Sequence, residues 1–193
     1  MPSERERLEQ VYGTLLTDAT IERWSESNPG NRAILSERVR CVRDMLAMGT
    51  ISQRSGKMSI LDLGSGGNTS LTPELDAASP DVTRIAVDLL FERLRPASPG
   101  VAVGLVCADG VALPFGDRTF DLVTLFTVFS SVGADTTCRA IAREVDRVLA
   151  PGGRVLWYDL RYRNPRNRGL RPFPRRQVEA TFPGFAAACR STT

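Results

Sequence analysis

A run of nine residues constrains the fold of this chain more than any other segment. Ile60-Leu61-Asp62-Leu63 is apolar except for its acid, and Gly64-Ser65-Gly66-Gly67-Asn68 follows directly. This order is typical of a buried parallel strand that passes into a helix beside a nucleotide-sized ligand, because glycine lets the backbone turn tightly and approach the ligand. A carboxylate fixed in such a turn would repel a pyrophosphate. Asp62 therefore favours a ligand that carries positive charge nearby.

The remainder of the chain alternates strand-like and helix-like segments. Strands are expected at residues 59–63, 84–88, 101–107, 120–126 and 154–159. Four of these segments are almost continuously apolar, as expected of strands covered on both faces. Strands that alternate with helices pair in parallel through right-handed crossovers, so we predict an α/β fold with a doubly wound, mostly parallel sheet.

Two helices are expected between these strands, and two more before them. One should run from a cap at Thr72 to about residue 79, and another from a cap at Asp135 to a stop at Pro151-Gly152-Gly153. In the first fifty residues, apolar positions recur at helical spacing, and Asn28 followed by Pro29 suits a cap and a first turn.

The composition excludes several kinds of site. The 193 residues contain no histidine, which removes histidine-dependent triads, most zinc catalysis and the commonest general base. The four cysteines are more than 30 residues apart and form no CxxC pair, so we expect reduced thiols and no metal site. No apolar run reaches the ~20 residues that span a membrane, and the first ten residues lack the apolar core of a secretory signal. We therefore expect a cytoplasmic protein with no membrane partner.

Acids stand at the ends of the first three predicted strands. Asp62, Asp88 and Asp109-Gly110 would meet at one edge of the sheet, where ligands of doubly wound folds bind. Taken singly, each has an ordinary explanation, since an acid at a strand end is more often capped or solvated and Asp-Gly alone is a turn. Their order and spacing together point to one ligand.

In that order and spacing, the chain resembles the class I S-adenosylmethionine-dependent methyltransferases. The resemblance covers roughly residues 58–160 and includes Phe120-Asp121-Leu122-Val123 and Arg147-Val148-Leu149-Ala150-Pro151-Gly152-Gly153. It implies S-adenosylmethionine as cofactor, whose sulfonium and ammonium suit the acid in the turn. One departure is Asn68, where the family often has a third glycine. The residues expected to contact the cofactor are Asp62, Gly64, Ser65, Gly66, Asp88, Leu89, Asp109, Gly110 and Phe126.

The same resemblance implies methyl transfer to an O or N atom of a small polar acceptor. Many small-molecule members have histidines where this chain has Ser130 and Ser131, so positioning of the acceptor is expected to matter more than a strong base. The segment after the fifth strand is rich in polar groups, and Tyr158, Asp159 and Arg161 are its catalytic candidates. The amino-terminal helices of this family commonly cover the pocket.

The domain organisation follows from this comparison. Residues 1–50 are predicted to form a helical lid and residues 51–193 the α/β domain, the two folding as one unit. The full sheet of the family ends in an antiparallel pair of strands, whereas only a sixth strand beginning near Phe185 is conceivable here. The sheet is therefore expected to lack its final strand or strands. A second copy, a partner chain or a rearranged tail would then cover the edge of the fifth strand.

Two other functions stay open. The chain could be a non-catalytic relative that serves as a partner subunit, or a nucleic-acid methyltransferase, since seven arginines lie between Arg161 and Arg176. The mild net charge of +3 argues against a nucleic-acid partner. An NAD-dependent oxidoreductase is disfavoured, because Thr69 stands where that fingerprint has its third glycine and Asp62 would face a pyrophosphate.

Overall fold

The structure is a computed structural model, and it divides into two compact units. One unit comprises Met1–Thr50 with Ala188–Thr193, and the other Ile51–Ala187. The residues that the structure describes are 3–13, 27–47, 57–66, 81–94, 103–163 and 169–188. The predicted helix at 72–79 lies outside these ranges, as do Asn68 and Thr69.

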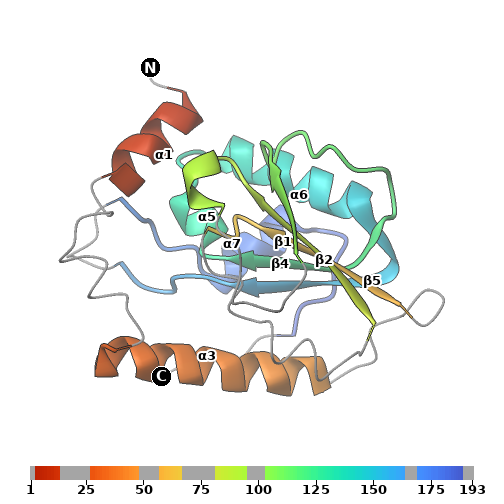
Figure 1. The fold of residues 1–193 in the computed structure, drawn as a ribbon, viewed down its shortest axis with the longest axis horizontal. Helices are drawn as coiled ribbons and strands as arrows, with labels where there is room; N and C mark the ends of the chain where they lie inside the picture. The colour runs from red at the N-terminus through yellow and green to blue at the C-terminus, as the bar shows by residue number, and fades with distance from the viewer. Residues whose placement is uncertain are drawn as a thin grey trace. The chain divides into compact units, whose positions relative to one another are not determined.

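The first unit contains two described helices, α1 (Glu4–Gly13) and α3 (Pro29–Ala47) (Figure 1). A reciprocal capping box begins α1, in which Ser3 Oγ accepts the amide of Glu6 at 3.2 Å and Glu6 Oε2 accepts the amide of Ser3 at 2.6 Å. The cap predicted for α3 is confirmed, because Asn28 Oδ1 accepts the amide of Gly30 at 2.9 Å. That these helices act as a lid stays a prediction.

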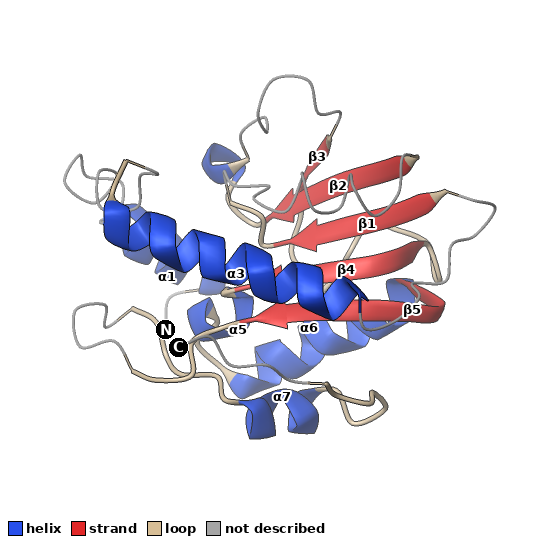
Figure 2. Cartoon of the chain, turned by 90° about the horizontal axis from the view of Figure 1, so that it is seen from below, coloured by secondary structure: helices blue, strands red, loops and turns tan. Residues whose placement is uncertain are grey.

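The second unit is built on a parallel sheet of five strands, in the order β3-β2-β1-β4-β5 (Figure 2). The strands are β1 (Met58–Leu63), β2 (Val82–Asp88), β3 (Gly104–Cys107), β4 (Phe120–Phe126) and β5 (Leu149–Tyr158). The helices are η1 (Phe91–Arg93), α5 (Val128–Ser131), α6 (Asp135–Val148) and α7 (Arg175–Thr181). Every pair of neighbouring strands is parallel. The predicted doubly wound α/β fold is confirmed, and the strand order reverses between β1 and β4.

The start of β5 differs from the prediction. The strand begins at Leu149 rather than Arg154, directly after α6 ends at Val148. The register shifts within it, since Phe120 pairs with Leu149 while Leu122 pairs with Arg154. The Pro-Gly-Gly segment that suggested a helix stop is thus an irregularity inside a strand. Gly152 makes it possible, because its φ of 79° lies in the left-handed region that glycine tolerates.

The cap predicted for α6 is also wrong. The N-cap residue is Ala134, and no side chain caps the helix. Asp135 is instead the first residue of α6, and its Oδ1 accepts hydrogen bonds from Arg171 Nη1 at 2.6 Å and Gln177 Nε2 at 2.9 Å. The carboxylate therefore ties α6 to the carboxyl-terminal part of the chain.

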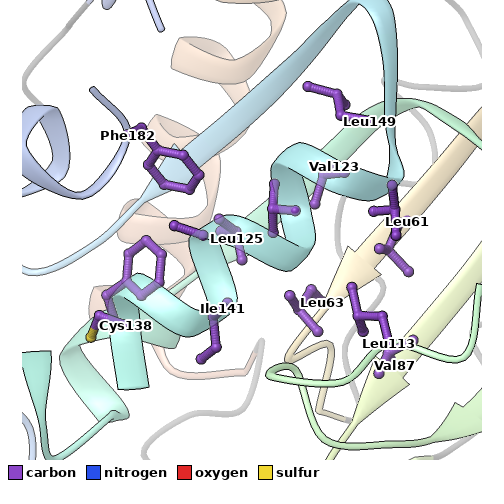
Figure 3. Close-up of a cluster of buried hydrophobic side chains, with 14 of the residues drawn as sticks. Leu61, Leu63, Val87, Leu113, Val123, Leu125, Cys138, Ile141, Leu149 and Phe182 are labelled. Atoms are coloured by element: carbon purple, nitrogen blue, oxygen red, sulfur yellow. The ribbon is translucent and has the colours of Figure 1, made fainter. Parts of the chain in front are cut away.

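The core lies between α6 and one face of the sheet. Ile141, Val145 and Val148 of α6 are buried, and they pack with fully buried strand residues such as Leu61 and Val123 (Figure 3). Of the cysteines in the described ranges, Cys41, Cys107 and Cys138 are free thiols, in line with the prediction. Within the same ranges, no helix has the length and apolarity needed to cross a membrane.

The segment after β5 does not continue the sheet. In the described residues up to 188 no strand follows β5, as expected of a sheet that lacks its final strand or strands, and Phe185, near which a sixth strand was conceivable, lies in a bend. Phe173 and Phe182 instead pack against Phe129, with ring centroids 4.8 and 5.9 Å away. The tail, as we call residues 169–188, therefore extends the core on the α6 side. The outer edge of β5 has no strand partner among the described residues.

Candidate functional site

Four strand ends meet at the carboxyl edge of the sheet, as predicted. The amides of Gly64 and Ser65 donate to the carbonyl of Val87 at 2.7 and 3.0 Å, which joins the ends of β1 and β2. The amide of Ala108 donates to Asp88 O at 3.1 Å, which joins β2 to β3. The predicted cofactor residues on these strands are therefore brought together at one edge.

The turn after β1 needs glycine at two positions. Gly64 has a φ of 71° and Gly66 a φ of 57°, both in the left-handed region where a side chain is strained. A Cβ on Gly64 would also lie 2.7 Å from Cγ2 of Val128. The turn thus presents bare backbone beside the ends of β1 and β4.

Asp88 is buried at the end of β2 and organises the backbone around it. Its Oδ2 accepts the amide of Gly66 and its Oδ1 the amide of Leu90, both at 2.9 Å. A third partner is Arg93 of η1, whose Nε lies 3.6 Å from Oδ2. One carboxylate therefore fixes both the glycine turn and the segment that follows β2.

The other two acids are less buried and are held differently. Asp62 Oδ1 accepts the hydroxyl of Thr124 at 2.6 Å, across the β1–β4 pair. Asp109 is exposed, and its Oδ1 accepts the amide of Val111 at 3.1 Å, which closes a turn within its own loop.

Side chains of α6 hold the loop that carries Asp109. Arg147 donates through Nη2 to Leu113 O at 3.0 Å and through Nη1 to Phe115 O at 2.8 Å. Glu144 Oε2 accepts the amide of Leu113 at 2.8 Å. The hydrogen bond from Arg147 lowers the pKa of Glu144, so the pair stays ionised. The arginine of the segment before β5 thus anchors the loop after β3.

The backbone is strained where the chain leaves β4, at residues 127–131, which we call the exit of β4. Thr127 has φ 55° and ψ 27°, a left-handed conformation that is rare for a β-branched residue. Its amide donates to Tyr158 O at 2.7 Å, and its carbonyl accepts the hydroxyls of Ser130 and Ser131 at 3.2 and 2.7 Å. The ring of Phe126, expected to line the cofactor, lies edge-on to Tyr158 at 5.9 Å.

Asp159, another of the three catalytic candidates, is bound to the segment after β4 through its carboxylate. Its Oδ2 accepts the amide of Ser130 at 3.0 Å and its Oδ1 the amide of Leu160 at 2.8 Å. Burial raises the pKa of this carboxyl, against the lowering effect of its hydrogen bonds. Arg161, by contrast, is exposed, and its guanidinium stacks on Tyr162 at 5.1 Å.

The tail also forms hydrogen bonds to the exit of β4 and to the segment after β5. The amide of Arg171 donates to Ser130 O at 3.0 Å, and the amide of Phe173 donates to Leu160 O at 2.8 Å. Arg171 Nε also donates to Val132 O at 2.9 Å. The tail therefore braces both segments beside the catalytic candidates.

Comparison with known proteins places this arrangement in a family. The family described as "Methyltransferase domain" matches residues 61–157, which is half of the chain. The chain belongs to this methyltransferase family. The matched residues include the ends of β1 to β4, so the class I resemblance stated from the sequence is confirmed.

Individual relatives match this methyltransferase-family chain over about half of its length. Demethylmenaquinone methyltransferase of Corynebacterium urealyticum is 38% identical over 96 residues, which is 50% of this chain and 39% of that protein. Malonyl-[acyl-carrier protein] O-methyltransferase of Methylococcus capsulatus is 37% identical over 100 residues, 50% of this chain and 35% of that protein. The match therefore spans well under half the length of these curated relatives.

A solved structure shows the same fold over most of the chain. The PH0226 protein from Pyrococcus horikoshii OT3 superposes with a TM-score of 0.63 at 17% identity, covering 83% of this chain and 84% of that one. This likeness supports the fold alone.

Sequence reasoning missed Arg93, Glu144 and the tail as parts of the site. Arg93 stands five residues after Asp88 in a short helix, and no motif that we used marks that position. The tail contacts join residues about 40 positions apart, such as Arg171 and Ser130, which spacing along the chain cannot reveal. In the described ranges, no group of three acids or cysteines is placed to hold a metal ion.

Proposed function

We propose that the chain binds S-adenosylmethionine at the carboxyl ends of β1 to β4 and transfers its methyl group to an O or N atom of a small polar acceptor. The observation that carries this proposal is Asp88, a buried carboxylate fixed by the amides of Gly66 and Leu90 beside a turn of left-handed glycines. A fixed carboxylate next to bare backbone suits a ribose diol next to the rest of a nucleoside.

The remaining predicted residues fit the other parts of the cofactor. We assign Gly64, Ser65 and Gly66 to the methionine portion, where Asp62 supplies negative charge for an ammonium. Asp109 and Gly110, at the end of β3, would take the adenine ring with Leu89 and Phe126 as apolar neighbours. When bound, the cofactor supplies a methyl group that is already primed for displacement, and the protein's residues orient the acceptor.

Positioning is the main contribution that we assign to the chain. Holding two reactants in line supplies on the order of 7–11 kcal/mol of a barrier. The brace of hydrogen bonds at Thr127, Ser130 and Asp159 would keep the acceptor side of the pocket rigid.

Asp159 is the candidate base, and its hydrogen bonds also suit a purely structural role. As a base it would accept the acceptor's proton, which its raised pKa favours. As a brace it serves through the two backbone amides that it accepts. Asp159→Asn separates these roles. Loss of a base cuts turnover by roughly 10²–10⁴ with little change in cofactor affinity. Loss of a structural contact would weaken cofactor affinity as well as turnover. Asp81→Asn, at an exposed acid that pairs with Lys57 before β2, is the matched control.

The acceptor class rests on this chain's own polar groups. The named relatives act on different acceptors, demethylmenaquinone and malonyl-[acyl-carrier protein], so they do not agree on one. Tyr158 ends β5, Asp159 and Arg161 follow it, and these side chains suit a polar or anionic molecule.

The test is a transfer assay with S-adenosylmethionine that carries a labelled methyl group, incubated with the protein and a fractionated metabolite extract. We expect label in a small polar product. If the protein binds the cofactor but labels no small molecule, the reading as a non-catalytic partner subunit replaces this one. Label found in nucleic acid instead would favour a nucleic-acid methyltransferase.

A further inference from the structure

A cation lies against the residue that we assign to the ribose. Arg93 Nε is 3.6 Å from Asp88 Oδ2, and the side chains of Arg93 and Asp88 are only 25% and 9% exposed. The short helix η1 holds Arg93 there, since the amide of Arg93 donates to Leu90 O at 3.0 Å and the amide of Leu90 donates to Asp88 Oδ1. The guanidinium thus lies against the carboxylate that we assign to the ribose.

The same guanidinium fills the space that Gly66 leaves open. A Cβ on Gly66 would lie 2.6 Å from Arg93 Nη2 and 3.4 Å from its Cζ. Absence of a side chain at Gly66 is what lets a ligand approach the turn closely. Arg93 therefore stands on both surfaces that the cofactor needs, the Asp88 carboxylate and the face of the glycine turn.

We propose that Arg93 is an internal competitor of the cofactor: its guanidinium pairs with Asp88 in the free protein and must withdraw when ribose hydroxyls take its place. This inference rests on the proposed function, because it assumes that the ligand at Asp88 is S-adenosylmethionine. Arg93 is then a residue that sets affinity, and it does so without contacting the reacting atoms.

Two consequences follow from competition. Only the fraction of protein in which Asp88 is uncovered can bind the cofactor, so the apparent affinity is lower than the intrinsic affinity. Removing the guanidinium should therefore tighten binding. A partly exposed ion pair is of modest strength, which corresponds to a gain of roughly 1.5- to 5-fold. Added salt weakens such a pair, so salt should also tighten binding in the wild-type protein.

The experiment is calorimetric titration with S-adenosylhomocysteine, which lacks the sulfonium charge and therefore reports the ribose contact with little salt dependence of its own. The proteins are wild type, Arg93→Met and Arg93→Gln. Arg175→Met is the matched control, because Arg175 pairs with Glu179 on the exposed side of α7. Each is titrated at low and at high salt, after a thermal melt confirms that it is folded.

We expect both Arg93 variants to bind roughly 1.5- to 5-fold more tightly than wild type and the control, and the difference to shrink at high salt. Weaker binding by the Arg93 variants would overturn the inference and make Arg93 a direct contact of the cofactor. Unchanged affinity would overturn it equally, leaving a pair that does not compete. If wild type itself binds no S-adenosylhomocysteine at millimolar concentration, the proposed function fails, and this inference fails with it.

Discussion

Replacing Phe173 with alanine tests whether the tail is an integral part of the fold. The side chain is fully buried, its ring lies 4.8 Å from that of Phe129, and its backbone amide bonds to Leu160. Truncating a buried phenylalanine to alanine removes about 3–5 kcal/mol of stability, through lost burial and the cavity that remains. For a domain of this size, roughly 3 °C of melting temperature accompanies each kcal/mol, so we expect a fall on the order of 10–15 °C.

The assay is urea unfolding followed by circular dichroism, with Phe91→Ala as the matched control. Phe91 is 68% exposed, so its truncation should change the free energy of unfolding by about 0.5 kcal/mol or less. Because Phe173 braces Leu160 beside the site, Phe173→Ala should also weaken cofactor binding at temperatures where it is still folded. A free energy of unfolding that matches that of Phe91→Ala would refute the account of the tail.

Two other changes test the anchors of the sheet and of the site. Gly153→Ala should destabilise the protein by about 1–3 kcal/mol, because the added Cβ would lie 2.8 Å from Ala150 O and 3.0 Å from Asp121 O; an unchanged urea midpoint would show that β5 has more room there. Glu144 has a lowered pKa, so its ionised form stabilises the fold above about pH 4.5 and this contribution is lost as the pH falls through the lowered value. Wild type should therefore be more stable than Glu144→Gln at pH 7, and the difference in unfolding midpoint should shrink as the pH falls below about 4.5. A difference that grows in acid would contradict the Glu144–Arg147 anchor.

The sheet could be predicted because its signals are local. The segment 120–126 is apolar and short, and β4 has those bounds in the structure. The acids at the ends of β1, β2 and β3 converge because parallel strands place their carboxyl ends at one edge. Their order along the chain was therefore enough to name the candidate site and the family.

The errors came from residues whose partners are distant. Pro151-Gly152-Gly153 has the local signature of a helix stop, yet Phe120 and Leu122 pair on either side of it and hold it within β5. Asp135 has the local signature of a cap, yet it bonds to Arg171, 36 positions away. Turn and cap propensities describe what a segment can do alone, and tertiary hydrogen bonds decided otherwise here.

The tail could be predicted only in part. The sheet was expected to lack its final strand or strands, with a sixth strand merely conceivable near Phe185, whereas the packing of Phe182 against Phe185 at 5.2 Å near the core had no signal in the sequence. Buried aromatic rings outweigh strand propensity because each removes a large apolar area from water. The cover predicted for the edge of β5 stays a prediction.

The most direct test of the central claim is the affinity of Asp88→Asn for S-adenosylhomocysteine, measured by calorimetry beside Asp81→Asn. Asp81 precedes the opposite end of β2 and its side chain pairs with exposed Lys57, so it controls for a charge lost far from the site. The account predicts that Asp81→Asn binds like wild type while Asp88→Asn loses at least 10-fold, as expected for roughly 1.5–3 kcal/mol from hydrogen bonds to a charged group. Equal affinity for the two variants, with both folded, would contradict the assignment of this strand end to the cofactor.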